Sequence, residues 1–401
     1  MATGHGRVAA VAATPFIAAV AAAGMIGAAG SAAAQVTAEE LMMHALGTAE
    51  GVDPVIVETF GRAAAGLSEE QRAKAIECWN DSSCDTGTGG EITVAYADGF
   101  GENVWRRVTA MEYIMQALTY PEIGRIIYTS ARGDAAKAIA DMRAYIAQDV
   151  DVIVMFADHG AALLPTVREA TEAGILVTVH NGTDVGGESG VDYVASIAED
   201  ICGLGTAFIQ VVAENSEGPT GVVELGGTPG NPLSLAWQAC SDAEIAKHEG
   251  MELLGVADTN WTQEGTFEAV SSFLAQYDKI DAYVYEYADG FRGAVRAYEA
   301  AERDMDMIVA LRTDEQGLFC DWEDAADPDF RIFYSSGQNY QSRIALTAAM
   351  MKLAGGEVPA SINVPFSMKE VTTGLCNRDL PLETSASALI DQEMLAAMFA
   401  E

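Results

Sequence analysis

Two short apolar runs, Val152-Ile-Val-Met-Phe156 and Ile175-Leu-Val-Thr-Val179, decide the fold of this chain. Strands that are buried on both faces of a parallel sheet have this nearly continuous apolar composition. A stretch with helical periodicity, Leu163–Ala173, separates the two runs. Parallel strands need such a crossover, so the stretch predicts a strand–helix–strand unit of an α/β fold.

The same alternation extends outward from this unit in both directions. We expect strands at Ile92–Ala97, Gly124–Thr129, Val150–Ala157, Ile175–His180, Tyr193–Ile197, Gly221–Leu225, Leu253–Ala257, Ala282–Tyr287, Ile308–Leu311 and Ile332–Tyr334. We expect helices near Val104–Leu118, Asp134–Gln148, Leu163–Ala173, Gly203–Glu214, Leu233–His248, Phe267–Gln276, Phe291–Glu302 and Ser342–Leu353. The alternation restarts after Tyr193–Ile197, which predicts two successive open α/β sheets.

The region before Glu91 has a different pattern. Thr37 to Glu40 and Ser68 to Gln71 have the spacing of capping boxes and predict two helices. The glycine-rich stretch Thr86–Gly90 predicts a flexible joint. This region is therefore expected to be a small helical extension ahead of the main fold.

The composition excludes several classes of function. The chain has 401 residues, with 22 Lys and Arg against 59 Asp and Glu, and a formal net charge of −37. Proteins that bind duplex nucleic acid or anionic lipid need a basic surface. Residues 1–60 contain one arginine, Arg7, and no lysine, so the basic helix-turn-helix of a repressor is excluded. We expect a solvated acidic surface and no nucleic-acid partner.

The N-terminal region reads as a targeting segment. Arg7 precedes an apolar run from Val8 to Ala34, which ends with small residues at Ala32 and Ala34. This pattern is typical of a signal peptide cleaved after Ala34, so the mature protein would begin at Gln35 in the periplasm. A permanent membrane anchor is the alternative, because the run is long enough to span a bilayer. Its Ala and Gly residues are only weakly hydrophobic, which favours cleavage.

Six cysteines follow the predicted cleavage site, and an exported protein can form disulfides. Cys78 and Cys84 flank a short polar turn and are expected to pair. Cys202, Cys240, Cys320 and Cys376 allow three pairings, and four buried free thiols stay open as an alternative. Cys320 and Cys376 follow similar Gly-Leu contexts and are expected in surface connections. No C-x-x-C spacing occurs, which disfavours a zinc site.

One short repeat lies at two predicted strand ends. Tyr96-Ala-Asp-Gly-Phe100 recurs as Tyr287-Ala-Asp-Gly-Phe291, one copy in each half. Ligands of open parallel sheets bind beyond the carboxyl ends of the strands. Facing lobes would therefore place Asp98 and Asp289 on opposite walls of one cleft. The alternative is that each aspartate caps the helix that follows it.

Two tryptophans also follow strand ends, Trp105 in the first half and Trp261 in the second. An aromatic face beside carboxylates and amides suits a sugar, because the ring covers C–H groups and the polar groups bind hydroxyls. Arg106 adds fixed hydrogen-bond donors. The alternative is that each tryptophan packs a helix against its sheet.

No catalytic signature is present: the chain has no G-x-S-x-G, H-E-x-x-H or phosphate-binding GK[ST] motif. His159 and His180 follow predicted strands near Asp158, but nothing in their spacing fixes a metal geometry. We therefore expect no catalysis, no cofactor and no metal.

Several short motifs, in order from Glu91 to Thr373, together resemble a known family. They are Ile92–Ala97 with Asn103-Val-Trp-Arg106, Gln148-Asp-Val-Asp-Val-Ile-Val154, Ala170–His180, Val222-Val-Glu-Leu-Gly-Gly227 and Gly293-Ala-Val-Arg-Ala297. The chain resembles the periplasmic sugar-binding proteins of ABC importers, the type I periplasmic binding proteins that include ribose- and galactofuranose-binding proteins. The resemblance implies two doubly wound lobes joined by a hinge.

With the signal peptide and the helical extension, which lie outside the resemblance, the chain is expected to divide as follows. Residues 1–34 are the signal peptide, 35–90 the helical extension, 91–199 with 337–363 the first lobe, 200–336 with 364–385 the second lobe, and 386–401 a tail helix. Three positions depart from the family pattern and leave the sugar open. His180-Asn181 stands where the family often has Asp-Arg, Tyr287-Ala288-Asp289 where it often has Asn-Asp, and Trp237 where it usually has Arg.

The expected function is capture of a sugar or sugar-like solute by a monomer that delivers it to the membrane permease of an ABC importer. A ligand receptor for a chemotaxis or sensor protein and a carbohydrate-active enzyme are the alternatives. The expected ligand-binding residues are Asp98, Asn103, Trp105, Arg106, Asp158, His180, Asn181, Asn231, Trp237, Trp261, Tyr287, Asp289, Asp314 and Gln338.

Overall fold

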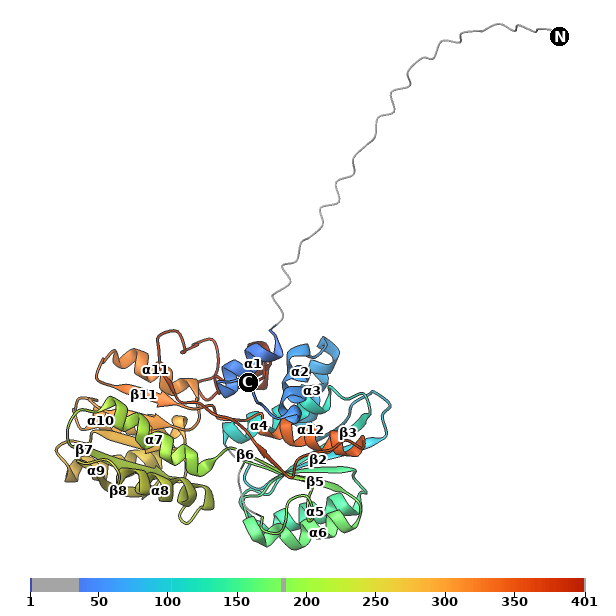
Figure 1. Cartoon of the computed structure of the whole chain (residues 1–401), viewed down its shortest axis with the longest axis horizontal. Helices are drawn as coiled ribbons and strands as arrows, with labels where there is room; N and C mark the ends of the chain where they lie inside the picture. The colour runs from blue at the N-terminus through green and yellow to red at the C-terminus, as the bar shows by residue number, and fades with distance from the viewer. Residues whose placement is uncertain (2–35, 102, 182–184, 400–401) are drawn as a thin grey trace. The chain divides into compact units, whose positions relative to one another are not determined.

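The computed structural model describes residues 1, 36–101, 103–181 and 185–399 (Figure 1). The predicted signal peptide and its cleavage site lie outside these residues, apart from Met1. No helix among the residues that the structure describes is long and apolar enough to cross a membrane.

The first lobe is built on a seven-stranded sheet, in which six neighbouring strands are parallel. In spatial order the strands are β1 (Ser83–Asp85), β3 (Ile123–Ser130), β2 (Ile92–Asp98), β4 (Val152–Phe156), β5 (Leu176–His180), β6 (Ala195–Ala198) and β12 (Ser361–Asn363). β1 is an antiparallel edge strand on β3, and β12 continues the parallel pairing beyond β6.

The second lobe has a six-stranded sheet. Its spatial order is β13 (Lys369–Glu370), β11 (Arg331–Tyr334), β10 (Ile308–Leu311), β9 (Ala282–Tyr285), β7 (Thr220–Gly226) and β8 (Met251–Asp258). All neighbouring pairs are parallel except β13 with β11.

The two sheets share one strand order. In the first sheet β2 lies between β3 and β4, and in the second β7 lies between β8 and β9. The chain therefore crosses to one side of the first strand and then to the other. This change of direction is the topological switch point, where open α/β sheets bind ligands beyond their carboxyl ends.

Helices cover both faces of each sheet (Figure 1). The first lobe uses α4 (Val104–Ala117), α5 (Ala135–Ala147), a 3-10 turn η1 (Gly160–Leu163), α6 (Leu164–Glu172) and α12 (Gln341–Leu353). The second uses α7 (Ile201–Asn215), α8 (Pro232–Ile245), α9 (Gln263–Gln276), α10 (Ala288–Ala300) and α11 (Gln316–Ala325). The predicted doubly wound α/β lobes are confirmed. The elements α2 (Pro54–Ala65), α11, β1, β12 and β13 were not predicted from the sequence.

Three connections join the two sheets. Glu199–Asp200 leads from β6 to α7, Ser335–Tyr340 leads from β11 to α12, and Val364–Met368 leads from β12 to β13. Gln338 and Pro365 link two of these connections, because the Gln338 side chain donates Nε2–H to the Pro365 carbonyl at 3.2 Å. Together the connections form the hinge between the lobes.

The segment before β2 belongs to the first lobe's core. It forms α1 (Ala38–Leu46), α2 (Pro54–Ala65), α3 (Glu69–Asp81) and β1. Both predicted capping boxes are present, at Thr37 and at Ser68. Phe60 of α2 packs on Tyr340 with ring centroids 5.3 Å apart. The predicted joint at Thr86–Gly90 is instead held to the sheet, because Thr86 Oγ1 donates to the Ile123 carbonyl at 2.7 Å.

The C-terminal tail ends in α13 (Gln392–Met398), which is shorter than the predicted tail helix. Met394, Leu395 and Met398 are buried in the same apolar cluster as α1, α2, α4 and α12. The chain after β13 therefore leads from the second lobe's sheet to the first lobe's core.

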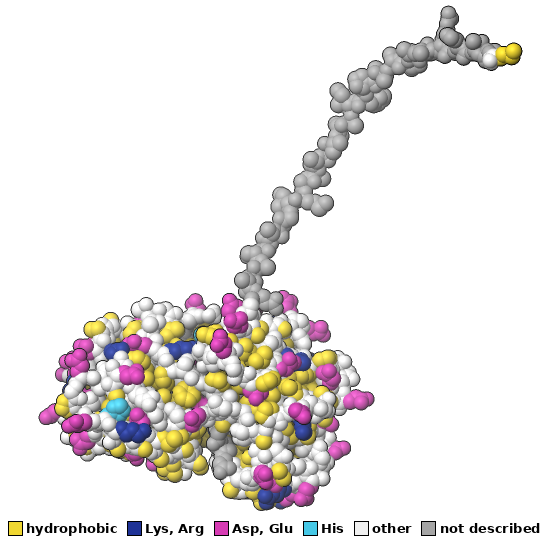
Figure 2. All heavy atoms as spheres, viewed as in Figure 1, with side chains coloured by type: hydrophobic (Ala, Val, Ile, Leu, Met, Phe, Trp, Pro, Cys, Tyr) yellow, Lys and Arg dark blue, Asp and Glu magenta, His cyan; other side chains and the backbone are white. Residues whose placement is uncertain are grey.

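The structure contains three disulfides: Cys78–Cys84, Cys202–Cys240 and Cys320–Cys376. The first was predicted from the sequence. The second joins α7 to α8. The expectation that Cys320 lies in a surface connection is wrong, because Cys320 is in α11 and is buried. On the face that Figure 2 shows, Asp and Glu side chains are spread over the surface, as the composition indicated.

Candidate functional site

A pocket lies where the carboxyl ends of the two sheets face each other. It has about 550 Å³ of empty space, part of which is open to solvent. Its walls are Phe100, Asn103, Trp105, Arg106, Phe156, Asp158, Asn181, Asn231, Leu233, Trp261, Glu286, Tyr287, Arg312 and Thr313. Each of these residues ends a strand or follows one by at most eight residues, so the pocket lies at the edge that the strand order favours.

Arg106 organises the first lobe's wall. Its Nη2 donates to Asp158 Oδ1 at 2.6 Å, and its Nη1 donates to Asp158 Oδ2 and Asp98 Oδ1 at 3.0 Å each. The guanidinium carbon lies 3.3 Å from the centroid of the Phe156 ring. A guanidinium held by two carboxylates and an aromatic face has one fixed orientation, so this wall is rigid.

Asp98 lies behind this wall and does not line the pocket. Its residue is 2% exposed, and burial raises its pKa to about 6 although Arg106 opposes the shift. The prediction that it forms a wall is wrong. Side chains alternate along a strand, and Asp98 shares a face with Val94 and Tyr96, which belong to the first lobe's core.

The second lobe's wall is built on the Glu286 carboxylate. It accepts hydrogen bonds from Trp261 Nε1 at 2.8 Å, Trp237 Nε1 at 2.6 Å and Ser234 Oγ at 2.5 Å. Burial raises the pKa of Glu286. Trp261 packs against Gly227, where a Cβ atom would come within 2.0 Å of the indole ring. The carboxylate and the glycine together fix the plane of Trp261.

Contacts between the lobes close the pocket. Arg312, from β10's end, donates Nε–H to Glu199 Oε1 at 2.6 Å, and its Nη2 lies 3.3 Å from Asn181 Oδ1. Trp105 Nε1 donates to the Gly337 carbonyl of the hinge at 2.9 Å. Because both tryptophan N–H groups bind protein atoms, the rings offer mainly their carbon surfaces to the pocket.

The structure brings eight of the fourteen expected ligand-binding residues to the pocket. They are Asn103, Trp105, Arg106, Asp158, Asn181, Asn231, Trp261 and Tyr287. Asn103 and Asn231 also cap α4 and α8, because their side-chain oxygens accept backbone N–H groups at 2.9 Å. The capping role that the sequence suggests for polar residues at strand ends therefore coexists here with a place in the pocket wall.

The other expected residues besides Asp98 lie outside the pocket as well. His180 is fully buried, its Nε2 is 3.1 Å from the Tyr96 hydroxyl, and burial lowers its pKa to about 3. His180 is therefore neutral at physiological pH. Trp237 is fully buried and contacts the pocket only through Glu286.

The three remaining expected ligand-binding residues also lie outside the pocket: Asp289, Asp314 and Gln338. Asp289 accepts from Gln263 Nε2 at 2.9 Å on the first turn of α10. Asp314 is fully buried and accepts the Ser385 hydroxyl. Gln338 is buried within the hinge. All three therefore serve the protein's own packing in this structure.

The repeated pentapeptide has two different structures. In the first copy Tyr96 and Asp98 belong to β2. In the second copy α10 begins at Ala288, directly after Tyr287. The two aspartates therefore occupy different places, and the expected symmetry across the cleft is wrong.

Six wall residues were not predicted from the sequence: Phe100, Phe156, Leu233, Glu286, Arg312 and Thr313. Phe156 and Glu286 lay inside predicted strands, and Arg312 and Thr313 directly followed one. Counting every residue within two positions of a predicted strand's last residue would have found these four. Among the residues that the structure describes, no group of three or more His, Cys, Asp or Glu side chains is placed to hold a metal.

Comparisons with known proteins agree with this geometry. The fructose-binding periplasmic domain of a hybrid two-component system has 22% identity and a TM-score of 0.62, covering 71% of this chain and 92% of that one. The periplasmic binding protein of the arabinose ABC transporter from Shewanella sp. ANA-3, bound to L-arabinofuranose, has 20% identity and a TM-score of 0.63, covering 69% and 91%.

A third similar structure, from Mycobacterium smegmatis in complex with β-D-fucofuranose, has 22% identity and a TM-score of 0.59, covering 70% of this chain and 91% of that one. At these identities the likeness shows the fold alone. A search of curated proteins found no match. The family model described as a periplasmic binding protein domain matches residues 99–357, well over half of the chain, and the chain therefore belongs to the periplasmic binding protein domain family.

Proposed function

We propose that this protein is exported with cleavage of residues 1–34, binds one small sugar or sugar-like solute between its lobes without converting it, and delivers it as a monomer to the permease of an ABC importer. The observation that carries the proposal is the placing of Trp105 and Trp261, from different lobes, on one pocket at the carboxyl ends of both sheets.

The chemistry of the walls suits a neutral, hydroxyl-rich ring. Two indole faces can cover C–H groups, and Asn103, Asn231 and Asp158 stand beside them with polar side chains. Arg106 is held by Asp98 and Asp158, so its positive charge is already compensated. A strongly anionic ligand would therefore meet no uncompensated cation on this wall.

The affinity that a receptor needs requires both lobes. Micromolar binding corresponds to about 8 kcal/mol. A stacked ring contributes roughly 1 kcal/mol beyond its area, and each hydrogen bond to a charged group about 1.5–3 kcal/mol. No single wall offers enough such groups. Binding is thus expected to favour the arrangement in which the lobes meet, which is how hinged receptors signal occupancy.

The structures with similar folds support the ligand class. Their names specify fructose, L-arabinofuranose and β-D-fucofuranose. One of them belongs to a two-component sensor system, so a sensor protein is the second candidate partner. Capture from detergent-solubilised membranes distinguishes the two, since a permease and a sensor kinase differ in their accompanying subunits.

The test uses the purified protein. Mass spectrometry of material released on denaturation, followed by thermal shift with D-fructose, L-arabinose, D-allose and myo-inositol, should give one retained compound or one saturable stabilisation. NMR of the best sugar after prolonged incubation should show it unchanged. Conversion of the sugar would make the protein an enzyme, and a pocket that binds none of these and retains nothing would contradict the proposal.

A further inference from the structure

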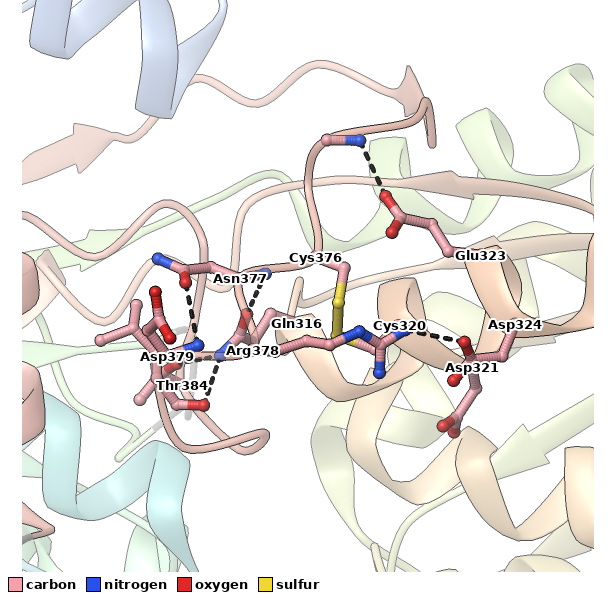
Figure 3. The surroundings of a disulfide bond; sticks show 12 residues. Gln316, Cys320, Asp321, Glu323, Asp324, Cys376, Asn377, Arg378, Asp379 and Thr384 are labelled. Atoms are coloured by element: carbon pink, nitrogen blue, oxygen red, sulfur yellow. Dashed lines mark hydrogen bonds and ion pairs between the residues drawn. A yellow bond between two sulfur atoms is a disulfide. The ribbon is translucent and has the colours of Figure 1, made fainter.

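The C-terminal strap, residues Val371–Asp391, is fixed to the second lobe at its beginning. The disulfide Cys320–Cys376 ties it to α11 (Figure 3). The side-chain amide of Gln316 in α11 makes two hydrogen bonds to the strap. Its Oε1 accepts Asn377 N–H at 2.7 Å, and its Nε2 donates to the Pro381 carbonyl at 2.9 Å. The start of the strap therefore moves with the second lobe.

The middle of the strap runs along the hinge. Ala386 N–H donates to the Asp314 carbonyl at 3.0 Å, and the Ser385 hydroxyl donates to the Asp314 carboxylate. The hydroxyls of Ser387 and Ser336 lie 2.7 Å apart. Ser336 belongs to the hinge connection from β11 to α12. The strap thus lies beside a hinge connection and is bonded to it.

The end of the strap is fixed to the first lobe. Leu389 N–H donates to Glu112 Oε1 of α4 at 2.7 Å. Ile390 is buried in the first lobe's core, and Arg72 of α3 donates Nη2–H to Asp391 Oδ1 at 2.7 Å. The strap therefore makes a fourth connection between the lobes, in addition to the three of the hinge.

Helix α1 holds the strap against the hinge. His44 Nε2 lies 3.0 Å from the Ala386 carbonyl, and Lys369 Nζ donates to the His44 carbonyl. The Tyr340 hydroxyl donates to the Ala45 carbonyl at 3.1 Å. One short helix thus contacts the strap, β13 and the start of α12, which lie on different connections. The family model matches residues 99–357, so α1 lies outside the matched part of the chain.

The strap has little slack. Ala386 is bonded both to Asp314 of the second lobe and to His44 of α1, and only two residues separate it from Leu389, which is bonded to Glu112 of α4. Three Cα–Cα steps span at most about 11 Å when the chain is fully extended. A rotation that separates the Asp314 carbonyl oxygen from Glu112 Oε1 by more than this span and the lengths of the two hydrogen bonds must break one of them.

We propose that the strap, held by α1, limits how far the lobes of this protein separate. The limit is a property of the chain without ligand. Its effect on ligand exchange rests on the proposed function, but the limit itself does not. A protein with a longer strap should therefore sample a wider range of separations between the lobes.

The experiment lengthens the strap by six residues of Gly and Ser between Ala388 and Leu389, which leaves every bond described above in place. A matched control carries the same insertion between Gly356 and Glu357, an exposed turn within the first lobe. Nitroxide labels on unnatural amino acids at Ala136 of α5 and Glu268 of α9, both exposed, report the distance between lobes by pulsed electron resonance. Lys369→Met, which removes one α1 contact, is a second variant if the insertion impairs folding.

In the protein without added sugar, the strap insertion should broaden the distance distribution and shift its mean upward, and Lys369→Met should do the same to a smaller extent. The control insertion should match the wild type. A distribution that is unchanged by both strap variants would overturn the inference. Because no ligand is added, failure of every sugar to bind would contradict the proposed function and leave this result intact.

Discussion

Replacing Trp261 with alanine is the sharpest test of the second wall. The indole ring forms one side of the pocket and rests on Gly227, with its N–H bound to Glu286. Removing it forfeits a stacking contribution of roughly 1 kcal/mol. It also uncovers apolar ligand area of about 40 Å², worth roughly 1 kcal/mol at 25 cal/mol per Å². The sum corresponds to about a thirtyfold rise in Kd.

The assay is isothermal titration with the sugar that gives the largest thermal shift. Trp322→Ala is the matched control, because Trp322 is also partly buried against the second lobe's core and donates its N–H to the Phe330 carbonyl at 2.7 Å, away from the pocket. Trp322→Ala should lower Tm and leave Kd unchanged. If Trp261→Ala also lowers Tm sharply and leaves Kd within twofold of wild type, Trp261 is a core residue and the wall is misassigned.

Four further outcomes are expected. Gly227→Ala should weaken sugar binding, because the added methyl group displaces the Trp261 ring. In denaturant titration the overpacking should lower the free energy of unfolding by about 1–3 kcal/mol. Unaltered binding would show that the ring moves freely. Burial raises the pKa of Glu224 from its usual value of 4.5 to about 7. Between these two pH values the carboxyl group is protonated in the native state and ionised in the unfolded state. The free energy of unfolding therefore falls by up to about 3 kcal/mol as the pH rises from 4.5 to 7. In urea unfolding, Glu224→Gln should leave this free energy unchanged at pH 4.5 and raise it at pH 8. Replacing both Cys320 and Cys376 with serine opens a loop of 56 residues' separation and should cost about 4 kcal/mol in the chain-entropy model, seen as a lower Tm. An unchanged Tm would mean that the hydrogen bonds between the strap and α11 hold it without the disulfide. Intact-mass analysis of protein exported by a Gram-negative host should place the N-terminus at Gln35, whereas retention of the full run in washed membranes would indicate an anchor.

Most of the fold was accessible from the sequence, because buried parallel strands are marked by their own composition. The strand at Ile308–Leu311 was predicted with its observed bounds, and the others differ by a few residues at their ends. The two- and three-residue strands β13 and β12 could not be predicted, since only pairing with a distant partner makes them strands. The pairing of Cys202 with Cys240 was open for the same reason: it depends on how α7 meets α8.

The sequence predicted where the site lies in the fold, but not which way its side chains point. The sequence places residues at strand ends, and this was sufficient for Trp105 and Trp261. Which way a side chain points depends on strand parity and helix face. Trp237 shares the buried face of α8 with Ser234 and Ser241, and His180 points into the first lobe. Glu286 was missed because a buried carboxylate inside an apolar strand has no signal of its own until its three donors are known.

The ion pair of Arg312 with Glu199 has a consequence for the size of ligand that the pocket accepts. Both side chains are almost fully buried, and the pair forms only when β10's end and β6's end come together. Leaving one partner of a buried pair alone costs about 3–5 kcal/mol. A solute one substituent too large would hold the lobes apart and separate the two charges before water could fully solvate them. Discrimination against oversized solutes would then come from a pair of protein charges, in addition to any steric clash with the solute itself.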